Sequence, residues 1–120
     1  IILDVAHNED GIKNLVNQIN ATNYNHLHIV FGIVKDKEVE KILSHLPTSA
    51  KYYFTKAQIA RALPEQELLE RAKKFNLEGN SYNEVNEALK AAIVVACKDD
   101  LIIVCGSVFV VGEVELISDN

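Results

Sequence analysis

Two runs of apolar residues, at positions 27–34 and 101–105, constrain the fold more than any other feature of the sequence. The first reads Leu-His-Ile-Val-Phe-Gly-Ile-Val and the second reads Leu-Ile-Ile-Val-Cys. Neither run alternates between apolar and polar residues, as a strand with one solvent-facing side does. Uniformly apolar strands are typical of parallel sheets that helices cover on both faces. The two runs therefore predict central strands of an α/β fold.

Helical patterns separate the strand-like runs along the whole chain. Strands are predicted at 1–3, 27–34, 50–54, 77–78 and 101–105, and helices at 9–21, 37–46, 64–75 and from a Ser81 cap to about 96. Pro47 ends the second helix, and Ser81 with Glu84 three residues later has the pattern of a capping box. This alternation predicts a Rossmann-like, three-layer α/β/α domain with a mostly parallel sheet.

Length and charge exclude several classes of protein. The chain has 120 residues, which suits one domain with a single core, and we interpret residues 1–120 as that domain. The net charge is -5 and there are only two Arg residues, so no nucleic acid partner is expected. No apolar run approaches the roughly 18 residues of a membrane helix, so no membrane partner is expected either.

The two cysteines and the missing methionine bear on the context of the chain. Cys97, on a predicted helix, and Cys105, in a predicted strand, have no metal-type spacing, and their apolar neighbours predict buried free thiols. Free thiols suit a reducing cytoplasm, where we expect the protein to reside. The sequence contains no Met at all and opens on a strand. We interpret it as a fragment of a longer enzyme.

Polar residues follow the first predicted strand within a short loop. The three aliphatic residues Ile1-Ile2-Leu3 predict a buried strand, and Asp4 follows it directly, at the edge where parallel strands present their carboxyl ends to ligands. His7 lies three residues on, and Asn8 is a candidate N-cap for the helix that follows. An Asp and a His in such a loop can also be turn formers and caps alone. The residues by themselves leave both interpretations open.

The string from Asp4 to Glu9 resembles a motif of a known family. It reads D-V-A-H-N-E and is similar to the D-G-A-H-N-P that opens the C-terminal domain of folylpolyglutamate synthases and dihydrofolate synthases, in the Mur ligase superfamily. This chain departs from that pattern with Val5 in place of Gly and Glu9 in place of Pro. A β-branched residue does not easily take the positive φ that Gly permits.

Three further strings extend the resemblance over the full chain. Residues 32–38 resemble the family's G-x-x-x-D-K-D, with Glu38 for the last Asp, and residues 55–62 resemble a loop that opens on Thr and ends on Arg-Ala, with Ala60 for Pro. Residues 106–113 are similar to G-S-[LV]-[FY]-[LV]-[VI]-G-E. Residues 108–111 favour a strand by propensity, but the family has a helix there. We follow the resemblance and expect a helix at 108–117, with an inward face made of Val111, Val114 and Leu116 or Ile117.

The resemblance implies ATP-dependent amide formation. A carboxylate of folate or dihydropteroate is phosphorylated to an acyl phosphate, which the amine of L-glutamate then attacks. Carried over residue by residue, Asp4 matches a position that contacts the nucleotide ribose, and His7 and Ser107 match positions that bind glutamate. Asn8, Lys37 and Arg61 are further possible site residues. No catalytic residue and no metal ligand is expected in this fragment alone.

No G-x-G-x-x-G or G-x-x-x-x-G-K-[ST] phosphate loop occurs in the sequence. The resemblance implies that an N-terminal ATPase domain holds the phosphates of ATP and the Mg²⁺ ion, so we expect the isolated fragment to be inactive. We also expect the enzyme to be a monomer. Two alternatives remain at this point. One is a peptidoglycan Mur-type amino-acid ligase domain, and the other is a noncatalytic Rossmann-like binding module.

Overall fold

A computed structural model describes residues 1–36 and 38–115 and contains a five-stranded sheet. Every neighbouring pair of these strands is parallel. The order across the sheet is β1 (Ile2–Leu3), β5 (Leu101–Cys105), β2 (Leu27–Phe31), β3 (Ala50–Phe54) and β4 (Glu78–Ser81). The two strands predicted to be central are thus neighbours in the middle of the sheet, as expected.

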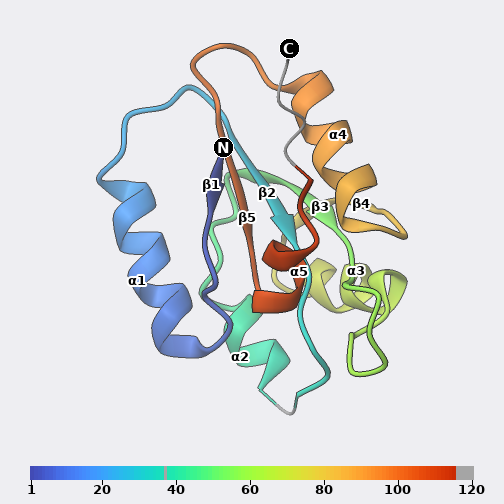
Figure 1. The fold of residues 1–120 in the computed structure, drawn as a ribbon. Helices are drawn as coiled ribbons and strands as arrows, with labels where there is room; N and C mark the ends of the chain where they lie inside the picture. Colours follow the sequence, from blue (N-terminus) through green and yellow to red (C-terminus); the bar gives the residue numbers. More distant parts are fainter. Residues whose placement is uncertain (37, 116–120) are drawn as a thin grey trace.

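Helices cover both faces of this sheet, so the predicted three-layer α/β/α fold is confirmed (Figure 1). One face is covered by α1 (Glu9–Asn20), α2 (Val39–Leu43) and α3 (Glu65–Lys73). The other face is covered by α4 (Val85–Val95) and α5 (Val108–Gly112). The buried apolar side chains accordingly form two clusters, one on each side of the sheet.

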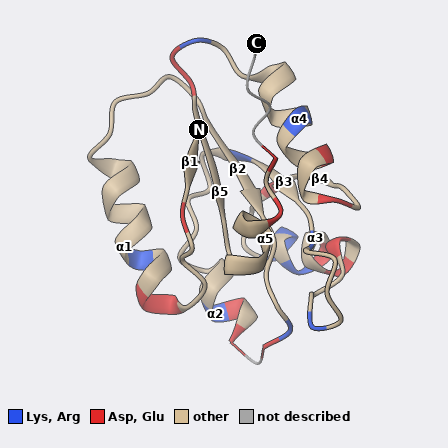
Figure 2. Ribbon diagram, in the orientation of Figure 1, with Lys and Arg blue, Asp and Glu red and all other residues tan. Residues whose placement is uncertain are grey.

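Alternate side chains of the central strands enter opposite clusters. In β2, Ile29 and Phe31 join the cluster under α1, α2 and α3, whereas Val30 joins the cluster under α4. All three are 0% exposed. Figure 2 shows charged residues on the helices and loops, and β2 and β5 contain none. Burial on both faces therefore explains why the two runs are nearly all apolar.

The first and second strands differ from their predicted form. The run 1–3 was expected to be a buried strand, but β1 lies at the edge of the sheet with Ile2 42% and Leu3 39% exposed. The apolar pattern could not show this, because an edge strand of two residues has a neighbour on one side only. The predicted strand 27–34 ends at Phe31, and Val34 instead forms an antiparallel bridge with Ala62.

The predicted capping box at Ser81 is wrong. Ser81 is the last residue of β4, and Glu84 occupies the N-cap position of α4 without a side-chain hydrogen bond. Backbone pairing with β3 therefore extends the edge strand into residues that had the pattern of a helix start. The prediction of two buried thiols is half right: Cys105 is buried, but Cys97 lies beyond the end of α4 and is exposed.

The segment after Ser107 is a helix, as the resemblance implied. Its regular part, α5, is only five residues long, and Val110 is its fully buried side chain. Val111 and Val114 pack against the same cluster at its margin, while Leu116 and Ile117 lie outside the described residues. Among the residues described, no helix has the length and apolar character to cross a membrane.

Candidate functional site

Two loops meet at the carboxyl ends of β1 and β5. The backbone N–H of Asp4 donates to the carbonyl of Val104 at 2.9 Å, which extends the pairing of the two strands. The N–H of Gly106 then donates to the carbonyl of Ala6, also at 2.9 Å. These two bonds place the loop that carries Asp4 and His7 directly beside Gly106 and Ser107. Residues a hundred positions apart in the sequence thus share one edge of the sheet.

Asp4 shapes its own loop. The side chain is half-buried, and its Oδ1 accepts a hydrogen bond from the backbone N–H of Ala6 at 2.8 Å. This contact spans two residues, as in an Asx-turn. Val5 stands where the related motif has Gly, but its φ is not positive. Among the described non-glycine residues, the one with a positive φ is Asn76. Since an ionised carboxylate can accept several hydrogen bonds, Asp4 retains capacity for a ligand hydroxyl.

His7 is exposed, and its ring is oriented by the main chain. The Nδ1 atom lies 3.1 Å from the carbonyl oxygen of Val5. A carbonyl oxygen can only accept, so the proton of a neutral His7 belongs on Nδ1. The Nε2 atom is then an acceptor in the neutral ring and a donor in the charged ring, which suits it to an amine or a carboxylate respectively.

Ser107 is the N-cap of α5, and its side chain is buried. It is 3% exposed, and its Oγ accepts a hydrogen bond from the N–H of Phe109 at 3.0 Å. The hydroxyl still carries a proton that it can donate. Because α5 has only five residues, its dipole adds little to the binding of an anion.

Gly106 lets the ends of β5 and β2 approach each other. Its φ is +106°, and a Cβ added there would lie 2.2 Å from the carbonyl oxygen of Gly32. No other residue could occupy that position without moving the backbone. The first glycine of the residue 32–38 string and that of the residue 106–113 string are therefore packed against each other.

The remaining predicted residues have separate locations. Asn8 caps α1, because its Oδ1 accepts from the N–H of Gly11 at 2.8 Å, which confirms the predicted cap. Arg61 is exposed on another loop, where its carbonyl accepts from the N–H of Lys35 at 2.8 Å. That bond joins the loops of two of the resembling strings. Lys37 lies outside the described residues.

Sequence reasoning missed several polar contacts around this edge. Thr55 is 0% exposed, and its Oγ1 has no hydrogen-bond partner among the described residues. Glu113 accepts from the N–H of Gln58 at 2.6 Å through its side chain and from the Asn86 amide at 2.8 Å through its carbonyl. The only sequence signal was that Thr55 and Glu113 belong to the resembling strings. Their partners are too distant in sequence for any local pattern to name them.

A cavity of about 750 Å³ opens at the opposite, amino edge of the sheet and includes His28 and Asp100 in its lining. His28 bonds to Tyr53 Oη through Nδ1 and to Asp100 through Nε2, each at 2.9 Å. The N–H of Cys97, followed by His28, lowers the pKa of Asp100 to about 2. We place the functional site at the carboxyl edge nevertheless, because ligands of open α/β sheets bind outside the carboxyl ends of the strands.

Comparison with known proteins gives a family match over most of the chain. The family described as Mur ligase, glutamate ligase domain, matches residues 1–108. A dihydrofolate synthase/folylpolyglutamate synthase of Buchnera aphidicola subsp. Schizaphis graminum is 32% identical over 100% of this chain and 29% of its own length. A probable bifunctional folylpolyglutamate synthase/dihydropteroate synthase of Haloferax volcanii is 31% identical over 94% of this chain and 14% of its own.

Solved structures resemble the fold closely. Escherichia coli FolC in complex with DHPP and ADP has a TM-score of 0.81 at 28% identity, over 90% of this chain and 26% of that one. A bifunctional folylpolyglutamate synthase/dihydrofolate synthase with Mn, AMPPNP and L-glutamate bound has a TM-score of 0.79 at 26% identity, over 92% of this chain and 27% of that one. The chain thus spans less than a third of the length of these relatives.

Proposed function

Because the chain belongs to the Mur ligase family as a glutamate ligase domain, we propose that it is the C-terminal domain of an ATP-dependent enzyme that adds L-glutamate to a folate or dihydropteroate carboxylate. The reaction activates that carboxylate as an acyl phosphate, and the glutamate amine displaces the phosphate. The part of this domain is to bind and orient glutamate and to contact the nucleotide. Holding the amine at attack distance from the acyl group can supply several kcal/mol of the barrier.

The observation that carries the proposal is the hydrogen bond from the N–H of Gly106 to the carbonyl of Ala6. It joins the two loops whose residues the resemblance assigns to glutamate, His7 and Ser107. We assign His7 Nε2 to a polar group of glutamate, since Nδ1 is engaged by Val5. The Ser107 hydroxyl donates to the same substrate while its oxygen continues to cap α5.

Asp4 is proposed to accept a hydrogen bond from a ribose hydroxyl of ATP. Its half-buried carboxylate, fixed by Ala6, suits a hydroxyl donor, as carboxylates do in other α/β nucleotide sites. The described residues contain no group of three or more His, Cys, Asp or Glu that could hold a metal ion. By themselves they do not provide a site that fits Mg²⁺. As the resemblance implies, we assign the metal and the ATP phosphates to an N-terminal ATPase domain.

The test is an assay of the complete protein with ATP, Mg²⁺ and L-glutamate. Phosphate release that requires both glutamate and either dihydropteroate or a reduced folate supports the proposal. Release that requires a peptidoglycan precursor instead would assign the chain to the other branch of the Mur ligases. Absence of release with every acceptor, together with intact nucleotide binding, would favour a noncatalytic module. Assaying the two folate-type acceptors separately distinguishes dihydrofolate synthesis from polyglutamate extension.

A further inference from the structure

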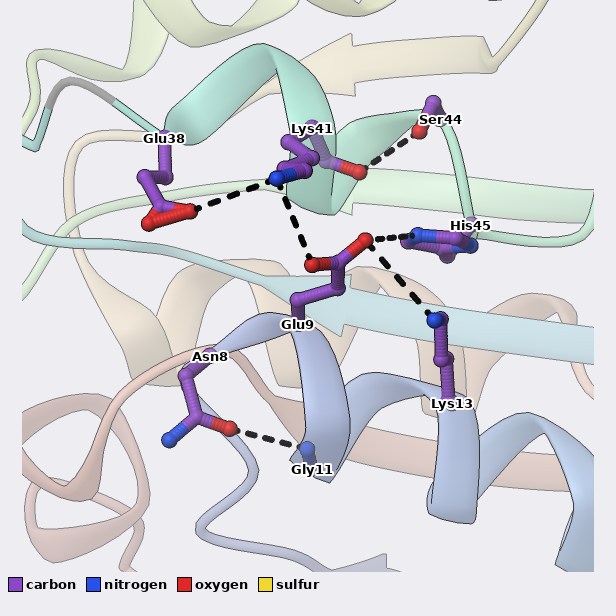
Figure 3. A network of polar contacts seen from close by, with 8 residues as sticks. All are labelled: Asn8, Glu9, Gly11, Lys13, Glu38, Lys41, Ser44 and His45. Carbon is purple, nitrogen blue, oxygen red and sulfur yellow. Dashed lines mark hydrogen bonds and ion pairs between the residues drawn. The ribbon is translucent and has the colours of Figure 1, made fainter.

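A group of charged side chains joins the first turn of α1 to α2, apart from the residues assigned to ligands above. The carboxylate of Glu9 lies 2.7 Å from His45 Nε2, 3.7 Å from Lys41 Nζ and 3.9 Å from Lys13 Nζ. Lys41 Nζ also lies 4.0 Å from Glu38. Figure 3 shows the Glu9 carboxylate between His45, Lys41 and Lys13, with the Asn8 cap on the adjacent turn.

The contact between Glu9 and His45 is the strongest of this group. It is the one pair at hydrogen-bond distance, 2.7 Å, and its side chains are 26% and 30% exposed. Lys13 and Lys41 are 52% and 59% exposed and stand farther from the carboxylate. Ion pairs with such exposed lysines contribute little, because water competes for both charges. The joint between the first turn of α1 and the chain just after α2 therefore depends mainly on Glu9 and His45.

The location of this joint connects it to the candidate site. Glu9 is the first residue of α1, and His7 precedes it by only two positions. On its other side the loop is fixed at Ala6, whose carbonyl accepts from the N–H of Gly106, so His7 and Asn8 span the interval between that bond and the first turn of α1. The direction in which the loop leaves α1 therefore depends on how the first turn of that helix is fixed to the rest of the domain.

We propose that Glu9 is a positioning residue for glutamate binding: it holds the first turn of α1 against the turn that follows α2 through His45, and so sets the place of His7 beside Ser107. This inference rests on the function proposed above. Glu9 does not itself contact the substrate. It acts through the main chain between positions 7 and 9, which Asn8 stiffens as the helix cap.

The charges around Glu9 fit this role. The hydrogen bond from His45, aided by Lys41 and Lys13, lowers the pKa of Glu9 below its ordinary value of 4.5. The carboxylate is therefore ionised at neutral pH and accepts from His45. The facing groups are Lys13 on its own helix and Lys41, His45 and Glu38 around α2, and Glu38 is the sole anion among them.

The experiment compares Glu9→Ala, Glu9→Gln, His45→Ala and the double variant Glu9→Ala/His45→Ala in the complete protein. Because the loop that carries His7 is displaced, Glu9→Ala should raise the glutamate KM by about 3-fold to 10-fold and leave the KM of the folate-type substrate within about 2-fold. Glu9→Gln keeps an acceptor oxygen and should remain within about 2-fold of the wild type for both substrates. The double variant should be no worse than the worse single variant, since the two residues act as one unit.

Glu70→Ala is the matched control, because it removes an exposed carboxylate that pairs with Lys73 at 3.2 Å on α3. It should change neither KM. Additive effects of Glu9→Ala and His45→Ala, or equal changes in both KM values, would overturn the proposal.

A readout without turnover separates this proposal from the proposed function. In the ligand-free protein, the NMR signal of the His7 ring should shift in Glu9→Ala and stay in place in Glu70→Ala. An unmoved His7 signal in Glu9→Ala defeats the positioning role whatever the activity. A wild-type protein that fails to use glutamate defeats the proposed function, and the His7 signal still decides whether Glu9 positions the loop.

Discussion

The ring of His7 is held by one atom and free to bind through the other. Its Nδ1 contacts the carbonyl of Val5, so a ligand must use Nε2. In the complete enzyme, His7→Ala should raise the glutamate KM and leave the folate KM almost unchanged. The loss in kcat/KM should be about 1 to 3 kcal/mol, as for a charge-assisted hydrogen bond. Steady-state kinetics with each substrate varied in turn provides the measurement.

His26→Ala is the control for that variant. The His26 side chain is 80% exposed and lies beside Asp100 at the amino edge, far from the proposed site. It should leave both KM values unchanged. If His7→Ala instead raises both KM values equally, His7 has a structural role in the loop and no direct contact with glutamate.

Asp100 makes the amino edge sensitive to acid. Hydrogen bonds from the N–H of Cys97, from His28 and from the N–H of His26 hold its pKa at about 2, below the ordinary 3.8. Because the pKa of Asp100 is lower in the folded protein than in the unfolded chain, its carboxylate stabilises the fold at every pH above its ordinary pKa. This contribution is lost as the pH falls from about 4 to about 2. Urea unfolding at several pH values should therefore show that the free energy of unfolding falls between about pH 4 and pH 2. In Asp100→Asn this dependence on pH should be weaker.

The neighbouring Asp99 offers the comparison for this prediction. Asp99 is exposed, and its main-chain carbonyl accepts from the N–H of Asn25. Asp99→Asn should keep the acid-dependent loss of stability. An unchanged pH profile in Asp100→Asn would show that other carboxylates control acid unfolding.

At the level of elements, burial on both faces was the part that the sequence could predict. The run 101–105 and the segment 50–54 match β5 and β3 residue for residue, and the nearly all-apolar run at 27–31 identified β2. These segments could be predicted because they are mainly apolar, as strands covered on both faces tend to be. The exceptions are His28, whose ring bonds to Tyr53 and Asp100, and the exposed Lys51. The helix α1 was predictable for a similar reason, since its cap Asn8 and its buried residues follow a local period.

The errors occurred where tertiary contacts override local patterns. Ser81 is a residue type that often caps helices, yet it is the last residue of β4 and pairs with Phe54. Ile2 and Leu3 have the composition of a core strand but lie at the edge of the sheet. Residues 108–111 have strand propensity but lie in α5, which begins where Gly106 turns the chain and Ser107 caps it. Only the resemblance indicated that helix.

The start of α5 gives a prediction about this element. Ser107→Ala removes the acceptor for the N–H of Phe109, and loss of such a cap costs about 0.5 to 2 kcal/mol. We therefore expect a lower melting temperature together with a higher glutamate KM. A residue that only contacted glutamate would raise the glutamate KM without lowering the melting temperature. Ser107→Thr keeps the hydroxyl and should retain most of both properties.

Thermal melts and glutamate kinetics on both Ser107 variants check this expectation. If Ser107→Ala lowers the melting temperature but leaves the glutamate KM unchanged, the hydroxyl is a helix cap and nothing more. Glutamate would then be bound by His7 with groups from elsewhere in the enzyme.

Across the whole molecule, topology made the candidate site predictable where individual contacts were not. A parallel sheet places the carboxyl ends of β1 and β5 on one edge, so Asp4, His7 and Ser107 could be grouped from the sequence. The contact between Glu9 and His45 could not be predicted from the sequence. The two residues are 36 positions apart, and neither is an unusual residue for its place in the chain. The contact of Glu113 with Gln58, 55 positions apart, was hidden for the same reason.

The buried clusters on the two faces of the sheet allow a last prediction, for residues 1–120 expressed alone. Both faces of the sheet have their own buried cluster, so this unit should fold by itself and melt cooperatively. It spans less than a third of the length of its relatives and has no phosphate loop in its sequence, so phosphate release from ATP should stay at background even with glutamate and a folate present. Adding the rest of the enzyme should restore turnover, and His7→Ala in residues 1–120 should weaken the restored turnover, which is the control for correct assembly. Turnover by residues 1–120 alone would show that they hold the ATP phosphates without a second domain, which would defeat the two-domain proposal.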